Sequence, residues 1–297
     1  MQRRRIGAYG LCRDGERVLL TRISPAGAFP GVWRLPGGAV GHAEHPDETV
    51  VRELAAQTGL SGTTAGVRAV VADVVALAGC AVHTDRLVYD VRVQVQAASP
   101  GPGGMIDRVR WLLPAELAGL PLMSFTAEVL GVPTTPLPAG RADQPPLPPQ
   151  VPDRGQRFGA YAVATDPAGR VLLTRIASGY PGAGRWHLPG GGTDHGEQPV
   201  TGLLRELVEE TGQLGRVGEL IAVNDSHNPR AMGPEGRPID WHVVRAIYRV
   251  AVDTPTAATV TEAAGGSTAE AAWFPIDGTA DLALTQVAAE ALRRIGT

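Results

Sequence analysis

The chain has 297 residues, of which 43% are hydrophobic and 19% are charged, and its formal net charge is −3. This length and composition are typical of a globular protein with room for two hydrophobic cores. A slightly acidic chain lacks the excess of positive charge that binds nucleic-acid polymers, so no such partner is expected. All 27 basic residues are arginine, which together with the abundant Ala, Gly and Pro indicates a GC-rich, bacterial genome.

In the N-terminal half, apolar and β-branched runs predict strands at 18–23, 87–96 and 109–113. A proline-rich segment follows at 133–154. Proline resists helix and sheet interiors and favours an extended polyproline II spacer. We therefore expect a linker at 133–154 between one domain at 1–132 and a second domain at 155–297.

The C-terminal half repeats this order of elements with clearer signals. Two strands are predicted, at 158–164 and 170–176, and the turn between them at 166–169 contains Asp, Pro and Gly. A glycine-rich loop then leads to an amphipathic helix, for which Gly212 is a plausible C-cap. These later elements are the loop at 180–192, the helix at 198–211, strands at 217–223, 241–252 and 272–276, and a closing helix at 282–295.

An internal repeat explains the shared order. The segment Val18–Ile23 returns as Val171–Ile176, and Trp33–Gly38 returns with one substitution as Trp186–Gly191. Both pairs are separated by 153 positions. A constant offset over a whole domain indicates duplication of one fold, and the offset is too long for a solenoid repeat.

Three carboxylates at helical spacing carry the strongest chemical signal. Glu206, Glu209 and Glu210 fall within an arc of roughly 100° on one face of the predicted helix. Carboxylates gathered in this way repel one another unless a cation lies among them, and hard cations such as Mg²⁺ or Mn²⁺ prefer oxygen ligands. The simpler alternative is a solvated acidic face.

The spacing around these residues distinguishes the two interpretations. Gly191 is followed by five residues and Glu197, then by seven residues and the run Arg205–Gly212, which reads RELVEETG. This resembles the Nudix box, and only Gln213 departs from it, where an apolar residue is usual. The resemblance implies an α/β fold of the α+β kind, with two tandem αβα sandwiches around mixed sheets. It also implies a metal-dependent hydrolase of nucleoside diphosphates linked to another group.

The resemblance also implies roles for individual residues. Arg205 is expected to pair with a carboxylate of the cluster, and Glu197 to orient the loop or a metal ligand. The backbone carbonyl of Gly190 is expected to bind the cation beside Glu206, Glu209 and Glu210, because glycine lets the backbone approach closely. One more carboxylate from outside the box is expected, and the candidates are Glu235, Asp240, Glu262 and Glu270.

The first copy of the box lacks two of these carboxylates. Ala56 and Gln57 stand where Glu209 and Glu210 stand in the second copy. Alanine offers no ligand and glutamine only a neutral carbonyl oxygen, while affinity at such sites depends on charged ligands. We expect an N-terminal domain that keeps the fold without the chemistry, with catalysis by Glu197, Arg205, Glu206, Glu209 and Glu210 of the second copy.

Substrate contacts are harder to predict. Arg175 is a candidate for a phosphate contact because guanidinium groups bind phosphate in a fork, although a surface ion pair is the simpler role. Trp186 and Tyr180 flank the loop at 180–192 and are candidates for stacking on a base, although a core position is the simpler role for Trp186. The expected partner is a nucleotide-type small molecule.

The two cysteines, Cys12 and Cys80, are too few for a disulfide framework. No secretory signal follows Met1–Ile6 and no segment approaches about 18 uninterrupted apolar residues. We therefore expect a cytoplasmic protein without a membrane partner. An intramolecular pseudo-dimer or a homodimer is possible for tandem domains of this kind.

The sequence thus predicts a pyrophosphohydrolase that acts through its C-terminal domain with Mg²⁺ or Mn²⁺, supported by its N-terminal domain. The alternative is a nucleotide-binding sensor or interaction module with little or no hydrolysis. A housecleaning and a biosynthetic role both fit the box.

Overall fold

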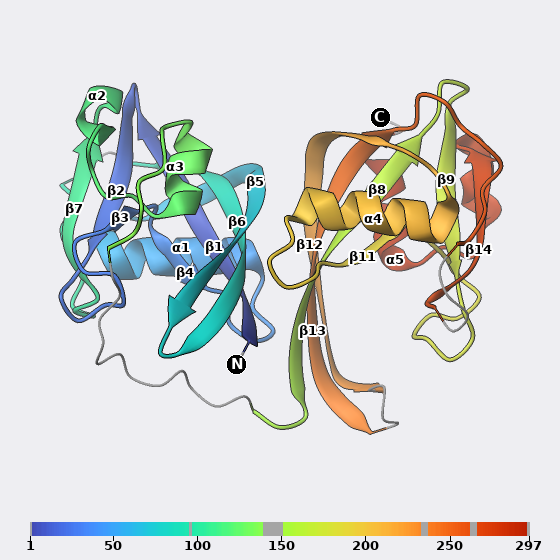
Figure 1. The fold of residues 1–297 in the computed structure, drawn as a ribbon, viewed down its shortest axis with the longest axis horizontal. Helices are drawn as coiled ribbons and strands as arrows, with labels where there is room; N and C mark the ends of the chain where they lie inside the picture. The colour runs from blue at the N-terminus through green and yellow to red at the C-terminus, as the bar shows by residue number, and fades with distance from the viewer. Residues whose placement is uncertain (1, 95–96, 139–150, 233–236, 262–265, 296–297) are drawn as a thin grey trace. The chain divides into compact units, whose positions relative to one another are not determined.

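The computed structural model describes residues 2–94, 97–138, 151–232, 237–261 and 266–295 (Figure 1). The chain divides into two compact units, Met1–Gln156 and Arg157–Thr297. Each unit has its own sheet and its own hydrophobic core. None of the helices in the described ranges is long and apolar enough to span a bilayer.

A seven-stranded sheet organises the N-terminal unit in the order β3-β2-β1-β6-β5, with β4 beside β1 and β7 beside β2. The central strand β1 is antiparallel to β2 and β4 and parallel to β6, so the sheet is mixed. The strands are β1 (Gln2–Asp14), β2 (Arg17–Ile23), β3 (Trp33–Arg34), β4 (Gly37–Ala39), β5 (Gly62–Leu77), β6 (Cys80–Val93) and β7 (Ile106–Leu112).

Helices cover both faces of this sheet, because side chains alternate along its strands. Tyr9 of β1 packs in the core cluster that contains Phe125 of α3 (Ser124–Leu130). Gly10 faces the other side, where an added Cβ would lie 3.1 Å from Val50 of α1 (Pro46–Thr58). A short helix, α2 (Pro114–Leu117), follows β7.

The C-terminal unit repeats the sheet order as β10-β9-β8-β13-β12, with β11 beside β8 and β14 beside β9. Its strands are β8 (Arg154–Thr165), β9 (Arg170–Ile176), β10 (Trp186–His187), β11 (Gly190–Gly192), β12 (Arg216–Met232), β13 (Pro238–Ala251) and β14 (Thr268–Pro275). Its helices are α4 (Pro199–Thr211), the 3₁₀ helix η1 (Asp277–Asp281) and α5 (Gln286–Arg293).

The two long helices of this unit lie on opposite faces of its sheet. In Figure 1, α4 crosses in front of β8 and α5 lies behind it. Leu207 of α4 packs near Val250 of β13, and both would meet a Cβ added at Gly215. Ala288 and Leu292 of α5 belong instead to the core cluster of Val163 and Leu173. The predicted fold class, two α+β sandwiches in tandem, is therefore confirmed.

Several predicted boundaries agree with the structure. Strand β9 has the bounds of the strand predicted at 170–176. Helix α4 ends at Thr211 with Gly212 in the left-handed region at φ 68°, as a glycine C-cap should be. Strands β12 and β13 are longer than the predicted 217–223 and 241–252. In the linker prediction, residues 139–150 lie outside the described residues, and β8 already begins at Arg154.

Two further predictions are wrong in their details. The segment 180–192 is not a loop throughout, because it contains the short strands β10 and β11. Its glycines permit close strand pairing, since a Cβ on Gly190 would lie 2.3 Å from the carbonyl oxygen of Ala160. The predicted strand at 87–96 begins earlier, at Cys80, because Ala78 and Gly79 form a two-residue turn with φ 47° and 75°. Residues 95–96 lie outside the described residues.

Candidate active site

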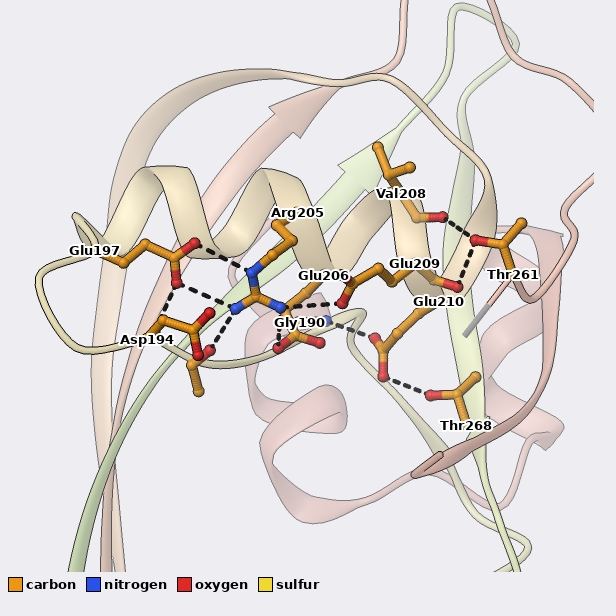
Figure 2. Close-up of polar contacts among 11 residues, drawn as sticks. Gly190, Asp194, Glu197, Arg205, Glu206, Val208, Glu209, Glu210, Thr261 and Thr268 are labelled. Atoms are coloured by element: carbon orange, nitrogen blue, oxygen red, sulfur yellow. Dashed lines mark hydrogen bonds and ion pairs between the residues drawn. The ribbon is translucent and has the colours of Figure 1, made fainter. Parts of the chain in front are cut away.

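Helix α4 presents one arginine among three carboxylates. Arg205 donates two hydrogen bonds to Glu197, from Nε and Nη2, each 3.1 Å long. Its Nη1 donates to Glu206 Oε1 at 3.1 Å and to Glu209 Oε2 at 3.0 Å (Figure 2). These contacts raise the pKa of Arg205, mainly through the hydrogen bonds to Glu197. A permanently charged guanidinium therefore holds the three carboxylates in fixed positions.

Glu197 also secures the loop before α4. Its Oε2 accepts a hydrogen bond from the backbone N–H of Asp194 at 2.7 Å, and Arg205 Nη2 donates to the carbonyl oxygen of Gly192 at 3.1 Å. Glu197 and Arg205 together tie the loop to the helix.

Glu210 lies on the side of the cluster away from Arg205 in Figure 2. Glu210 is only 3% exposed to solvent. One carboxylate oxygen accepts from the N–H of Gly190 at 2.8 Å and the other from the hydroxyl of Thr268 at 2.5 Å. A buried carboxylate requires hydrogen bonds or a nearby cation, since its charge is costly in a medium of low dielectric constant.

The glycines of β11 lie directly against these carboxylates. A Cβ on Gly191 would lie 2.7 Å from the carboxyl carbon of Glu206. Gly190 has φ 135°, a conformation that other residues rarely adopt. The side chains of Glu206, Glu209 and Glu210 thus gather around Arg205 and the glycines of β11. Carboxylate and carbonyl oxygens are the ligands that Mg²⁺ and Mn²⁺ prefer.

The sequence profile of the NUDIX domain matches the chain twice, at residues 1–130 and 155–295. The chain is a member of the Nudix hydrolase family. The Nudix box therefore accounts for the acidic cluster, and the tandem arrangement predicted from the internal repeat is confirmed.

Known proteins with a similar sequence belong to the same family. The chain is 34% identical over 151 residues to "Putative 8-oxo-dGTP diphosphatase 3" of Mycobacterium tuberculosis, covering 47% of this chain and 68% of that protein. It is 40% identical over 60 residues to human "Diphosphoinositol polyphosphate phosphohydrolase 3-beta", covering 20% of this chain and 35% of that protein. Among solved structures, the MutT protein from Methanosarcina mazei Go1 is 19% identical with a TM-score of 0.40, covering 48% of this chain and 94% of that one.

The one departure from the Nudix box has a structural explanation. Gln213 is 1% exposed, and its side-chain N–H groups donate to Thr211 O at 3.1 Å and to Thr256 Oγ1 at 2.9 Å. Its Oε1 accepts from the N–H of Thr256 at 2.9 Å. The amide is buried like the usual apolar residue, and its hydrogen bonds compensate for the lost solvation.

In the Nudix box of the N-terminal unit, Arg52 binds two glutamates as Arg205 does in the second box. Arg52 donates to Glu44 Oε1 at 2.7 Å, to Glu44 Oε2 at 2.9 Å and to Glu53 Oε1 at 2.5 Å. The hydrogen bonds from Arg52 lower the pKa of Glu44 to about 2. The local geometry that holds Glu206 in the second copy is therefore retained around Glu53 in the first.

The difference between the copies lies at Gln57, the counterpart of Glu210. Its Nε2 donates to the carbonyl oxygen of Gly37 at 2.8 Å and to Glu53 Oε2 at 2.7 Å. By the constant offset of 153 positions, these two acceptors correspond to Gly190 and Glu206, two of the expected cation ligands. An amide N–H group thus lies against the oxygen atoms that a cation would need.

The candidate substrate residues lie in different places. Arg175 pairs with Glu270 at 2.7 Å, and both side chains are nearly half exposed, so the ion-pair alternative describes it. Trp186 packs edge-on against Phe274 with ring centroids 4.7 Å apart and borders the hydrophobic core. This position agrees with the simpler role considered for Trp186, that of a core residue. Tyr180 is 42% exposed and lines a cavity.

Of the four carboxylates considered outside the box, two lie among the described residues, and the choice among the four stays a prediction. Glu270 contacts Arg175, and the carboxylate of Asp240 lies 2.6 Å from Nε2 of His227. Glu235 and Glu262 lie outside the described residues.

The cavity of about 350 Å³ adjoins the acidic cluster, because Glu210, Gly190 and Gly191 belong to its wall. Its remaining wall includes residues that the sequence analysis missed, namely Arg157, Tyr161, His187, Trp241, Arg245 and Thr268. Strand alternation offered a signal for some of them, since Trp241, Val243 and Arg245 occupy alternate positions of a predicted strand. Burial, with a smaller contribution from Arg245, lowers the pKa of His187 to about 4, so its imidazole is neutral near pH 7.

Proposed function

We propose that the C-terminal Nudix domain hydrolyses a diphosphate bond in a nucleoside diphosphate derivative, with Mg²⁺ or Mn²⁺ held by Glu206, Glu209, Glu210 and the carbonyl oxygen of Gly190. The observation that carries the proposal is the junction of this oxygen-rich donor set with a cavity, since Glu210 belongs to both. A bound divalent ion would offset phosphate charge and make bound water more acidic.

The protein groups supply the positioning on which such a reaction depends. Arg205 holds Glu206 and Glu209, while Gly190 and Thr268 hold Glu210. Tyr161, Tyr180 and Trp241 line the cavity and offer aromatic surfaces for a base. The mycobacterial relative's name makes 8-oxo-dGTP one candidate substrate for a screen of nucleotides.

We further propose that the N-terminal Nudix domain hydrolyses nothing. Ala56 supplies no ligand, and the amide of Gln57 donates hydrogen bonds to Gly37 and Glu53. Because an amide N–H and a cation compete for the same lone pairs, this arrangement disfavours a metal ion at the first box.

The test replaces Glu210 with glutamine in the full chain. Glu210→Gln keeps the size of the side chain but allows it to donate toward Gly190 and Glu206, as Gln57 does in the first box. We expect turnover of the best substrate from a nucleotide panel to fall at least about 100-fold, since a charged metal ligand is lost. Formation of the nucleoside monophosphate product in the presence of Mg²⁺ or Mn²⁺, followed by chromatography, is the measurement.

Glu219→Gln is the matched control, because Glu219 is an exposed glutamate of β12 in the same domain. It should leave turnover unchanged. Near-normal turnover in Glu210→Gln would place the chemistry elsewhere, and wild-type protein without hydrolysis of any nucleotide would favour a binding module.

A further inference from the structure

Two arginines in the cavity wall of the C-terminal unit have no carboxylate partner among the described residues. Arg245 donates from Nη1 to the hydroxyl of Ser226 at 2.9 Å and to Asn224 Oδ1 at 3.5 Å, and both partners are neutral. Its Nε is buried without a hydrogen-bond partner within the described parts of the chain. A partly buried guanidinium without a counter-ion keeps an uncompensated charge, so a ligand of opposite charge would be stabilised there.

Arg157 is the second cation of this wall. Its guanidinium lies over Gly192, since a Cβ added there would be 2.8 Å from Nη2. Gly192 in turn accepts from Arg205, so Arg157 lies close to the box glycines, while Arg245 lies near His187. The cavity therefore has carboxylate from Glu210 at one part of its wall and two guanidinium groups at others.

In the N-terminal unit the counterpart of Arg245 is Arg86, and this arginine has an internal counter-ion. In the strand register, Arg86 of β6 lies opposite Val71 of β5, and Arg245 of β13 lies opposite Asn224 of β12. The two arginines therefore occupy equivalent positions in the two sheets. Two positions further along those strands stand Asp73 in the first unit and Ser226 in the second. Asp73 Oδ1 accepts from Arg86 Nε at 3.0 Å and from Nη2 at 2.7 Å.

The space around Arg86 is also filled. The Tyr9 hydroxyl accepts from Nη1 of Arg86 at 2.6 Å, and the guanidinium lies 4.5 Å from the Phe125 ring centroid. Arg86 is only 1% exposed. In the second unit the counterpart of Tyr9 is Tyr161, which faces Gly190 across the strand pair as Tyr9 faces Gly37, and which lines the open cavity.

We propose that Arg245 and Arg157 bind a phosphoryl group of the ligand, and that Ser226 stands where an internal counter-ion would otherwise neutralise Arg245. The assignment deepens the proposed function, on which it rests for the nature of the ligand. In this assignment the two arginines hold a phosphoryl group of the ligand whether or not a cation is present.

The experiment measures binding of inorganic pyrophosphate to the full chain by calorimetry, in EDTA and at constant ionic strength. We expect measurable binding by wild-type protein and at least tenfold weaker binding by Arg245→Gln, because a charge-assisted hydrogen bond is lost. Arg157→Gln should weaken binding in the same direction. The matched control is Arg249→Gln, which removes an exposed positive charge from the same strand outside the cavity wall and should change the Kd less than twofold.

The decisive variant is Ser226→Asp, which transfers the counter-ion of the first unit to the second. It should weaken pyrophosphate binding at least tenfold without lowering the thermal unfolding midpoint, since the new carboxylate can pair with Arg245. Ser226→Ala should bind like wild type. Absence of binding by wild-type protein, or unchanged binding by both Arg245→Gln and Ser226→Asp, would overturn the proposal.

Pyrophosphate binding by the two arginines can be tested separately from the proposed hydrolysis. Glu210→Gln should retain pyrophosphate binding in EDTA while losing turnover. Retained binding by wild type and loss of binding in Ser226→Asp would support the arginine site even if no nucleotide were hydrolysed. Conversely, hydrolysis that depends on Glu210 but ignores Ser226→Asp would leave the proposed function intact and remove the arginine site.

Discussion

Gln57 and Glu210 have side chains of nearly the same shape and differ in whether they can donate a hydrogen bond. The Gln57 amide donates to Gly37 and Glu53 and thereby satisfies two oxygen atoms within the protein. The Glu210 carboxylate can only accept, and it takes its hydrogen bonds from Gly190 and Thr268. At this position the amide closes a network of hydrogen bonds around Glu53, whereas the carboxylate adds oxygen acceptors to the proposed cation site.

His187 gives a prediction about pH at the same scale. Its folded-state pKa is about 4, below the ordinary value of 6.5, because the ring is buried and lies near Arg245. Between these values the unfolded chain binds more protons than the folded one, so stability falls as the pH is lowered. The stabilisation is fully present above pH 6.5 and is lost as the pH falls toward 4.

The measurement compares unfolding of wild type and His187→Gln at pH 7 and pH 5. We expect wild type to lose up to about 2 kcal/mol more than the variant over this interval, since one pKa unit corresponds to 1.36 kcal/mol. The same loss in both proteins would show that His187 does not carry the effect.

At the scale of elements, the glycines of β11 determine how closely the strand approaches α4. Gly191 leaves room for Glu206, whose carboxyl carbon would lie 2.7 Å from an added Cβ. The first unit has the same contact between Gly38 and Glu53, at 2.8 Å. A methyl group added at Gly191 would meet only the carboxylate end of the flexible Glu206 side chain. It would therefore displace this carboxylate without disrupting strand β11.

We therefore expect Gly191→Ala to lower turnover at least about tenfold, by moving the proposed metal ligand Glu206, while the unfolding midpoint changes little. Gly38→Ala makes the equivalent change in the box that we propose to be inactive and should leave turnover unchanged. Kinetics and thermal unfolding of both variants check this. Equal effects of the two substitutions on turnover would contradict the assignment of catalysis to the second box.

Element types and order were predictable because hydrophobic period, turn residues and the repeat all agreed. The box carboxylates were predictable because they lie on one helix, where spacing alone fixes the shared face. Arg157 and Arg245 were not, because they lie on strands 88 positions apart in the sequence, and only the sheet order brings them to one cavity. Thr268 was missed for the same reason, and strand β11 (Gly190–Gly192) was predicted as part of a loop because glycine in sequence favours a loop.

At the scale of the molecule, each unit has its own core. Two separate cores predict two thermal unfolding transitions, of which a ligand stabilises only the one it binds. We expect saturating Mn²⁺ to raise one transition in the full chain, and Glu210→Gln to abolish that rise. Scanning calorimetry is the measurement, with Glu53→Gln in the first box as the control that should preserve the rise. A Mn²⁺ shift of both transitions, or one that survives Glu210→Gln, would contradict the proposal of a silent first box.

Gln213 also bears on how the Nudix motif is defined. The final position of the motif is usually written as a preference for an apolar residue, yet here an amide fills it, enclosed and hydrogen-bonded to Thr211 and Thr256. What the fold demands at that position is exclusion of water with every polar atom satisfied, and hydrophobicity is one chemical solution to that demand. A search rule that scores this position by polarity would penalise a sequence whose box helix and Arg205 hydrogen bonds are intact. A rule that scores whether the side chain can be buried with its polar atoms satisfied would retain it.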